Sequence, residues 1–407
     1  MNLIWLLVNI VEVIIYAYLG FAALYIFIFG MASLFRYRLP RQSDGRKRRF
    51  AVLIPGYKED AVIIEVARKS LEQDYPTEAF EIIIIADSFQ PNTLNELRKL
   101  PIRVVEVSFE ISTKSKALNT AMAEIGDNYD VALILDADNI MKKDFIYKIN
   151  QAFDRGFIAV QGHRAAKNMN SSMAILDAVS EEINNSIFRK GHRVLGFSSA
   201  LIGSGMAFEY AFFKKLMLEI KAVGGFDKEL ELRLLKDKQK IEYVEDALVL
   251  DEKVQKTEVF ATQRKRWLSA QFVYFGRFAL PGLKELFKSG NFDFADKVYQ
   301  MIQPPRILLI GILTILTFIM AMIHQFASVW MWTNMLFDFF SWLVIWSLSF
   351  LAFLFSIPGK FYSAKTANAL LSLPKGFLLM LLSLFKLKGA NKRFIHTAHG
   401  VDEDKKK

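Results

Sequence analysis

The chain of 407 residues contains no cysteine, carries a formal net charge of +10 and is 53% hydrophobic, with 36 phenylalanines. The lack of cysteine excludes disulfides, thiolate metal ligands and cysteine nucleophiles. The apolar composition predicts membrane segments, and the basic balance fits either nucleic acid or an anionic membrane surface as a partner.

The first predicted element is an apolar helix at the N-terminus. The segment from Leu3 to Phe35 is interrupted mainly by Asn9 and Glu12, and it exceeds the roughly 20 residues that span a bilayer. It lacks a basic start and a small-residue cleavage site, which disfavours a cleaved signal peptide. We therefore predict a transmembrane helix over residues 1–36.

A basic juxtamembrane linker is predicted to follow over residues 37–49, which are rich in arginine. The positive-inside rule places this linker and the domain after it in the cytoplasm. We therefore expect an integral protein of the plasma (inner) membrane. Because the linker explains much of the basic charge as lipid-facing, we expect no nucleic-acid partner.

The next region, from residue 50 to about 208, alternates short apolar runs with helical periods. Strands are predicted at Phe50–Ile54, Phe80–Ala86, Ile102–Val107, Val131–Leu135 and Ile158–Gly162. Helices are predicted near Ala61–Leu71, Asn92–Leu100, Lys116–Ile125 and Lys142–Arg155. This alternation predicts an α/β fold with a mostly parallel, Rossmann-like sheet covered by helices.

Two carboxylates follow the strand Val131–Leu135. Asp136 and Asp138 are one residue apart, at the strand end where open α/β sheets place their ligands. This spacing lets both side chains reach one hard cation, Mg²⁺ or Mn²⁺, and the phosphates that it holds. Alternatively, Asp138-Asn139 caps the next helix, and the motif alone leaves both interpretations open.

Other loops at the same sheet edge carry polar residues. The first strand leads into a Pro/Gly turn with Tyr57 and Glu59, the second ends at Asp87, and Lys114 precedes a later helix. An aromatic ring and carboxylates suit a nucleotide base, and lysine suits phosphate. Together these loops predict a nucleotide site around Asp136.

The motifs then form a recognisable series: IPGYKED, IIIIADS, KSKALN, ILDADN, GSGMAF, GGFDKELELRLL, YVEDALVLDE and QRKRW. In this order they resemble the membrane-embedded family-2 glycosyltransferases with a GT-A fold, the branch of cellulose, chitin, hyaluronan and poly-N-acetylglucosamine synthases. The resemblance covers Phe50 to Gln271 and implies a GT-A domain over 50–271. It also implies a UDP-sugar donor, a divalent cation (Mg²⁺ or Mn²⁺) and inversion at the anomeric carbon.

The resemblance assigns roles to individual positions. The positions that match donor nucleotide contacts are Pro55, Tyr57, Glu59, Asp87, Lys114, Asp136, Arg264 and Arg266. Asp138, with Asp136, matches the metal-binding aspartates. Gln263 and Trp267 match the acceptor positions. Gly205, in the Gly203-Ser204-Gly205-Met206 stretch, either lets the backbone approach the acceptor closely or belongs to a simple turn. The chain departs from the family at Ala86, where many members have an aspartate, and at Thr113 and Lys116, which replace small glycines.

A general base is also required, since the attacking hydroxyl must lose its proton as the bond to UDP breaks. Two acids compete for this role. Asp227 precedes Glu-Leu-x-Leu-Arg as the family's base does, although Phe226 stands where the family usually has Glu. Asp246 lies in a Glu-Asp pair, but its motif better fits a later strand. We predict Asp227 as the base and keep Asp246 as the alternative.

The C-terminal third is predicted to return to the membrane. Residues 272–303 suit interfacial amphipathic helices around a break at Pro281-Gly282, and 304–358 suit a transmembrane hairpin. Residues 359–390, with basic flanks, suit an interfacial helix rather than a fourth transmembrane helix. Residues 391–407 then form a basic cytoplasmic tail.

The function predicted from the sequence is transfer of a sugar from a UDP-sugar to a growing β-linked polysaccharide at the membrane. One alternative is non-processive addition of a single sugar to a membrane lipid. A second alternative is an inactive membrane scaffold or a transporter. Three spans are few for a self-contained polymer channel, so the expected partners include an accessory secretion subunit or a homo-oligomer, besides the donor and a polysaccharide or glycolipid acceptor.

Overall fold

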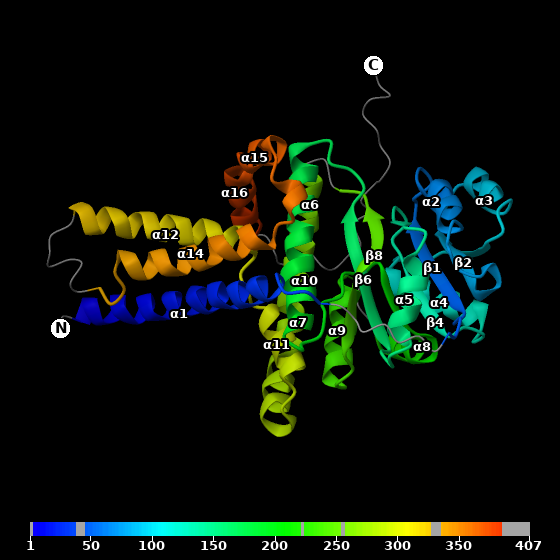
Figure 1. Cartoon of the computed structure of the whole chain (residues 1–407), viewed down its shortest axis with the longest axis horizontal. Helices are drawn as coiled ribbons and strands as arrows, with labels where there is room; N and C mark the ends of the chain where they lie inside the picture. Colours follow the sequence, from blue (N-terminus) through cyan, green and yellow to red (C-terminus); the bar gives the residue numbers. More distant parts are fainter. Residues whose placement is uncertain (1–2, 38–44, 221–223, 254–256, 327–334, 385–407) are drawn as a thin grey trace, which may run out of the picture.

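A computed structural model describes residues 3–37, 45–220, 224–253, 257–326 and 335–384 (Figure 1). Three long helices lie side by side at one end of the molecule, and an α/β domain forms the other end. A layer of helices that includes α6 and α10 runs across the junction, roughly perpendicular to the three long helices. The α/β domain therefore lies next to a helical bundle, with the layer of helices between them.

The α/β domain is built on one sheet with the strand order β3-β2-β1-β4-β7-β6-β8-β5. The strands are β1 (Phe50–Tyr57), β2 (Phe80–Asp87), β3 (Arg103–Val107), β4 (Val131–Ile134), β5 (Ile140–Met141), β6 (Ala159–Ala166), β7 (Met206–Glu209) and β8 (Ile241–Asp251). The strands β3, β2, β1 and β4 are parallel to one another, and β6 is parallel to β8. β7 is antiparallel to its neighbours β4 and β6, and β5 is antiparallel to β8. The predicted mostly parallel α/β fold is confirmed, and the antiparallel β7 and the short β5 add to it.

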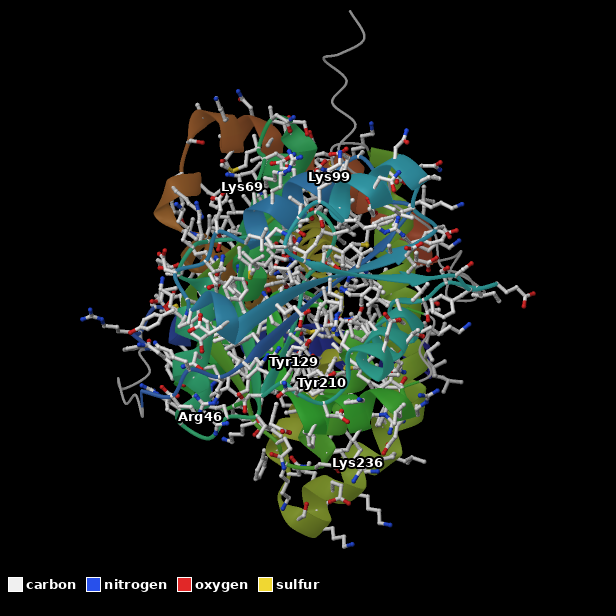
Figure 2. All side chains as sticks on the ribbon, turned by 90° about the vertical axis from the view of Figure 1, so that its right-hand side faces the viewer. Arg46, Lys69, Lys99, Tyr129, Tyr210 and Lys236 are labelled. Atoms are coloured by element: carbon white, nitrogen blue, oxygen red, sulfur yellow. The ribbon has the colours of Figure 1, made fainter. Side chains whose placement is uncertain are left out.

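Helices cover both faces of the sheet. They are α2 (Ile63–Ser70), α3 (Pro91–Leu97), α4 (Lys114–Ile125), α5 (Phe145–Phe153), α6 (Ser172–Asn184), α7 (His192–Val194), α8 (Tyr210–Glu219) and α9 (Phe226–Lys236), with the π-helix η2 (Asn185–Gly191) between α6 and α7. One apolar core lies between the sheet and α4, α8 and α9, and a second lies between the sheet and α2 and α5. Viewed from the domain end, Tyr129 and Tyr210 lie together, with ring centroids 5.3 Å apart (Figure 2).

Three described helices are long and apolar enough to cross a membrane: α1 (Leu3–Ala32), α12 (Arg306–Phe326) and α14 (Phe339–Ser356). Their contact faces are filled by apolar side chains such as Ile26, Leu313 and Ile345. Helix α1 also packs against η2, where a Cβ on Gly191 would overlap the carbonyl oxygen of Phe29. The bundle and the α/β domain are thus in tight contact.

The segment after the sheet differs from the prediction. Helix α10 (Thr257–Ser289) continues through Pro281, so the break expected at Pro281-Gly282 is wrong. The absence of a side chain on Gly282 lets α10 approach Val298 of α11 (Phe292–Gln300) closely, since a Cβ there would lie 2.8 Å from Val298 Cγ2. This packing offsets the hydrogen bond that proline removes.

The last described helices are α15 (Ala364–Leu370) and α16 (Leu373–Leu384). Helix α16 lies across α12, because Gly311 leaves room for the ring of Phe377. The interfacial helix predicted within 359–390 is thus divided near Ser372, and its end at 385–390, like the tail at 391–407, lies outside the described residues. Whether this segment crosses the membrane stays a prediction, as do the domain boundaries.

Candidate active site

The loops after β1, β2 and β4 meet at one edge of the sheet. Tyr57 pairs with Asp87 in the register of β1 and β2. A Cβ on Gly56 would lie 3.5 Å from Cβ of Ala137, between the two aspartates. Lys58 has a φ of +56°, and its amide donates to the Asp87 carbonyl over 3.0 Å. The structure thus brings the predicted uridine contacts and the two aspartates together.

Pro55 and Glu59 frame the same turn. Pro55 lies within β1 beside Ile85 of β2. Glu59 is buried, and its carbonyl accepts from the amides of Val62 and Ile63, where α2 begins. These two positions hold the turn in place beside Tyr57.

Lys114, the first residue of α4, connects two loops of the site. Its ammonium pairs with the carboxylate of Asp136 and donates to the carbonyl of Gly203 over 2.8 Å. The Asp136 amide donates to Oγ of Ser204 over 3.0 Å. The loop after β4 and the glycine loop before β7 are therefore fixed to each other around one lysine.

Asp138 is buried and has a different environment. Its carboxylate accepts from the amide of Glu252 and from Nδ2 of Asn139, each over 3.1 Å. The next element is β5, and the N-cap of α5 is Asp144. The structure thus excludes the helix-cap alternative for Asp138-Asn139.

The residues present fit a divalent cation. Asp136 and Asp138 offer hard oxygen ligands on one loop, of the kind that Mg²⁺ and Mn²⁺ bind. The part of the chain that the structure describes contains no cluster of three or more His, Cys, Asp or Glu side chains suited to a metal. The other ligands would thus be substrate phosphate oxygens and water, the usual arrangement for Mg²⁺ with nucleotides.

A buried ion network, which the sequence reasoning missed, lies behind the aspartates. Arg164 of β6 lies 2.9 Å from Glu181 of α6, 3.6 Å from Asp251 and 4.0 Å from Asp136. Lys253 pairs with Asp251 over 2.7 Å. Burial favours the protonated acids, but these cations outweigh it and hold the pKa values of Glu181 and Asp251 below their usual range. These ion pairs hold the side chain of Arg164 in place beside Asp136.

Asp227 lies close to Gly203, whose carbonyl accepts a hydrogen bond from Lys114. Helix α9 begins after its N-cap Gly225, whose φ of +68° suits glycine, and Asp227 lies in the first turn of this helix. A Cβ on Gly203 would lie 3.7 Å from the Asp227 carboxyl group, while the ammonium of Lys114 is 5.5 Å from the ring centroid of Phe226. The structure therefore places Asp227 beside the cluster of Lys114 and Asp136.

The comparisons with known proteins agree with this geometry. The model of the family described as glycosyltransferase-like family 2 matches residues 47–270. The chain belongs to this family. It is 26% identical to the probable glycosyltransferase YdaM of Bacillus subtilis (strain 168) over 246 residues, 57% of this chain and 58% of the relative. It is 27% identical to a beta-monoglucosyldiacylglycerol synthase of Trichormus variabilis over 231 residues, 53% of this chain and 47% of that protein.

The chain thus spans about half the length of the curated relatives that it matches. Among solved structures, the mannosyltransferase PcManGT from Pyrobaculum calidifontis, in complex with GDP-Man and Mn²⁺, is similar over 92% of this chain and 97% of that chain. The TM-score is 0.55 at 14% sequence identity, which supports the fold alone. The α/β domain of this family-2 member is therefore of the GT-A type.

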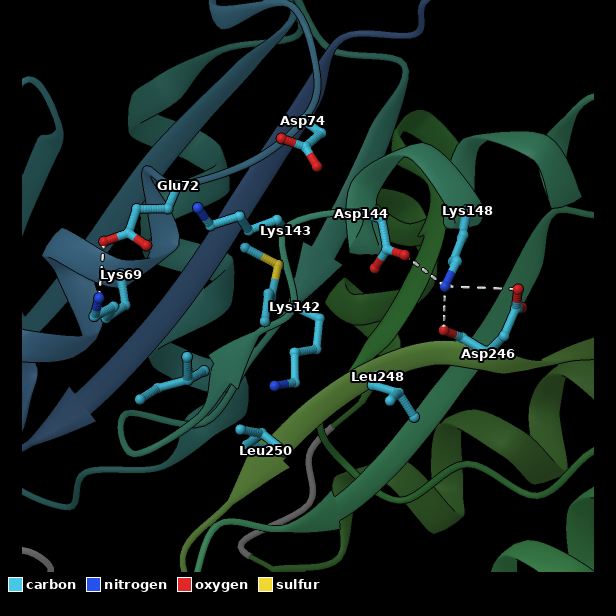
Figure 3. Close-up of a pocket in the computed structure, with 12 residues that line it drawn as sticks. Lys69, Glu72, Asp74, Lys142, Lys143, Asp144, Lys148, Asp246, Leu248 and Leu250 are labelled. Atoms are coloured by element: carbon cyan, nitrogen blue, oxygen red, sulfur yellow. Dashed lines mark hydrogen bonds and ion pairs between the residues drawn. The ribbon is translucent and has the colours of Figure 1, made fainter.

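Within the family-2 domain, the alternative base Asp246 lies apart from Lys114. Residues 245–247 form a bulge in β8, because the register with β6 shifts between Gly162 and His163. The side chain of Asp246 is 74% exposed, 3.6 Å from Lys148 of α5. It borders an open groove of about 600 Å³ at the β5 edge of the sheet (Figure 3). The structure thus groups Asp227, and not Asp246, with the predicted donor residues.

The predicted acceptor residues of this family-2 domain, and the two predicted donor arginines beside them in the QRKRW motif, are described only in part. Gln263, Arg264 and Arg266 lie in α10, and their side chains are outside the described residues. Trp267 is half-buried at the same helix. Gly205 has a φ of +61°, and a Cβ there would lie 2.7 Å from Val249, so packing within the protein already requires glycine.

Proposed function

We propose that this protein transfers one sugar from a UDP-sugar to a lipid acceptor at the cytoplasmic face of the membrane, with inversion of the anomeric carbon. The observation that carries the proposal is the grouping of Asp136, Lys114 and Asp227 around one loop of a domain that packs directly on membrane-length helices. A soluble acceptor would not require that contact. A lipid acceptor would remain in the bilayer while its hydroxyl reached the domain.

In the proposed reaction, Asp227 accepts the proton of the acceptor hydroxyl while that oxygen bonds to the anomeric carbon of the donor. The bond from this carbon to the UDP oxygen breaks, and UDP leaves with the electron pair. Lys114 and the arginines Arg264 and Arg266 lie on elements where they would stabilise the diphosphate. Asp136 and Asp138 would hold Mg²⁺ or Mn²⁺, which supplies further positive charge to the leaving group.

Other residues in the proposal bind and orient the substrates. Tyr57, Glu59 and Asp87 would bind the uridine at the β1–β2 edge, with Pro55 shaping the turn. Trp267 would stack on the acceptor sugar or headgroup, next to Leu268, which packs on α12 and α16. Because Leu268 contacts these helices, Trp267 lies close to the bilayer boundary that a lipid acceptor would cross.

The membrane placement is part of the proposal. Helices α1, α12 and α14 would span the membrane, and α10 and α11 would lie along its cytoplasmic surface. Leu280 and Phe287 on one stripe of α10 are 79% and 81% exposed. Rings and aliphatic chains exposed in this way on a helix with basic neighbours are typical of contact with lipid headgroups.

A lipid acceptor is favoured over a growing polysaccharide by the bundle interior. In the described part of the three helices, the contact faces consist mainly of apolar residues such as Leu19, Leu309 and Leu313, with a few buried polar side chains, Glu12 and Ser349 among them, whereas a polymer path requires continuous polar, hydrated walls. Two relatives are named beta-monoglucosyldiacylglycerol synthase, which fits a lipid acceptor. The order of the motifs still favours polymer elongation as the second candidate, with a partner or second copy completing the path.

Product size distinguishes these candidates. The purified full-length protein in lipid nanodiscs would be incubated with Mg²⁺ or Mn²⁺ and a panel of radiolabelled UDP-sugars, with diacylglycerol, its monoglycosylated form or polyprenyl phosphate as acceptor. The proposal predicts UDP release that depends on one lipid and yields a product with one added sugar. High polymer would refute the lipid proposal in favour of the second candidate, and no UDP release with any pair would support the scaffold or transporter alternative.

A further inference from the structure

A buried ion pair anchors the helix that carries Asp227. Glu231, one turn along α9, lies 2.6 Å from the ammonium of Lys297 on α11, and both side chains are less than a tenth exposed. The second oxygen of Glu231 accepts from the amide of Leu201 over 3.3 Å, two residues before Gly203. Glu231 thus holds both the helix of Asp227 and the loop that Asp227 touches.

The pair continues as a hydrogen-bonded chain to the membrane helix α1. Lys297 donates to Oε1 of Gln300 over 3.1 Å, and Gln300 donates to Asp296 over 2.9 Å and to the hydroxyl of Tyr25 over 3.1 Å. Tyr25 donates to Asp296 over 2.7 Å, and its hydroxyl lies 2.8 Å from Nε2 of the fully buried His192. Tyr25 belongs to α1, so polar contacts run without a gap from α9 to the bundle.

We infer that this chain of contacts, from Glu231 through Lys297 to Tyr25, positions Asp227 at a fixed height above the membrane, where the hydroxyl of a membrane-held acceptor is presented. This inference rests on the proposed function, in which Asp227 is the general base. Glu231 and Lys297 are positioning residues: they touch neither the donor nor the acceptor, and they act through α9.

Stability alone is a poor explanation for the pair. Removing two charges from water costs several kcal/mol, and well-packed apolar residues of similar size often stabilise a core as well or better. Burial raises the pKa of Glu231, and the charge of Lys297 opposes that rise. What an ion pair provides and an apolar contact lacks is one defined partner and direction, which fixes the rotation and height of α9 relative to α11.

The test compares positioning with stability in the full-length enzyme in nanodiscs. A Glu231→Leu/Lys297→Met double variant replaces the pair with apolar groups, so that neither Glu231 nor Lys297 remains buried without the other. We expect its melting temperature and its affinity for UDP to stay close to those of the wild type, its KM for the UDP-sugar to change less than twofold, and its kcat for transfer to fall tenfold or more. The conservative Lys297→Arg variant, which keeps the pair, should retain most of kcat, and Tyr25→Phe should lower kcat severalfold.

The matched control is Lys214→Met, which breaks an ion pair with Asp127 on the exposed side of α8 and should leave kcat unchanged. A double variant with wild-type kcat overturns the inference. So does one that unfolds or loses UDP affinity in parallel with kcat, because the pair would then serve stability only. Failure of the proposed function would look different, since the wild-type enzyme itself would then transfer no sugar.

Discussion

Replacing the proposed base tests the site most directly. Asp227→Asn keeps the size and shape of the side chain beside Gly203, so packing should change little, but the amide cannot accept the acceptor proton. A positioned general base typically contributes a factor of roughly 10² to 10⁴. At about 1.4 kcal/mol for each factor of ten, the barrier to transfer should rise by about 3 to 5 kcal/mol. UDP affinity should be unchanged, because in the proposed reaction Asp227 contacts the acceptor hydroxyl and not the nucleotide.

Asp246→Asn is the matched control for this substitution. It neutralises an acid whose side chain is 74% exposed and whose partner, Lys148, is 3.6 Å away. Exposed pairs of this kind contribute about 0 to 1 kcal/mol to stability, and Asp246 lies apart from the predicted donor residues, so folding and kcat should change little. Both variants would be assayed for UDP release at saturating donor and lipid, with UDP affinity measured separately by calorimetry. Full turnover by Asp227→Asn, or loss of turnover only in Asp246→Asn, would refute the assignment.

Three further predictions concern the donor loop and the membrane junction. Asp138→Ala should abolish the gain in UDP affinity that Mn²⁺ gives, as measured by calorimetry with and without the ion; an unchanged metal effect would remove Asp138 from the metal site. Lys114→Met removes the ammonium proposed to bind the donor diphosphate, and a hydrogen bond to a charged group contributes about 1.5 to 3 kcal/mol. KM for the donor should therefore rise roughly tenfold or more in steady-state assays, and an unchanged KM would count against its phosphate role. Glu182 is buried, which opposes its ionisation, but His163 and Lys360 lower its pKa to about 2; its stabilising contribution is therefore complete above the unfolded pKa of about 4.5 and is lost as pH falls towards 2. The melting temperature of Glu182→Gln should accordingly depend less on pH between 4.5 and 2 than that of the wild type, and identical pH slopes would contradict this.

The sequence predicted the helices and strands whose apolar residues recur with a regular spacing or form a continuous run. The strands at Phe50, Phe80 and Val131 and the helix at Lys114 appear within a few residues of their predicted bounds, since each buries a continuous apolar face. β7 and β5 contain four and two residues, too few for a periodic signal, and β7 follows directly on a glycine loop. Their pairing is decided by distant strands and not by local sequence.

The candidate site divides in the same way. The sequence predicted Asp136, Asp138 and Lys114 as site residues, because the order of strands and helices along the chain shows which polar residues lie in the loops at the sheet edge. Spacing could not show that Arg164, Glu181 and their partners form a buried network, because a charged residue in an ordinary strand or helix gives no sign of burial. The break predicted at Pro281 failed for a related reason: only the contact of Gly282 with α11 shows why the helix continues.

One departure from the family pattern can be explained by this arrangement. Phe226 stands where the family usually has Glu, directly before Asp227. In the structure its ring is buried in the core and lies 5.5 Å from the ammonium of Lys114, within the range of a cation–π contact. A glutamate there would add a third carboxylate near Lys114 and compete with Asp136 for its charge. The aromatic ring contacts Lys114 without adding a competing carboxylate, so Phe226 preserves the ion pair with Asp136 and the hydrogen bond to Gly203 that link the two loops.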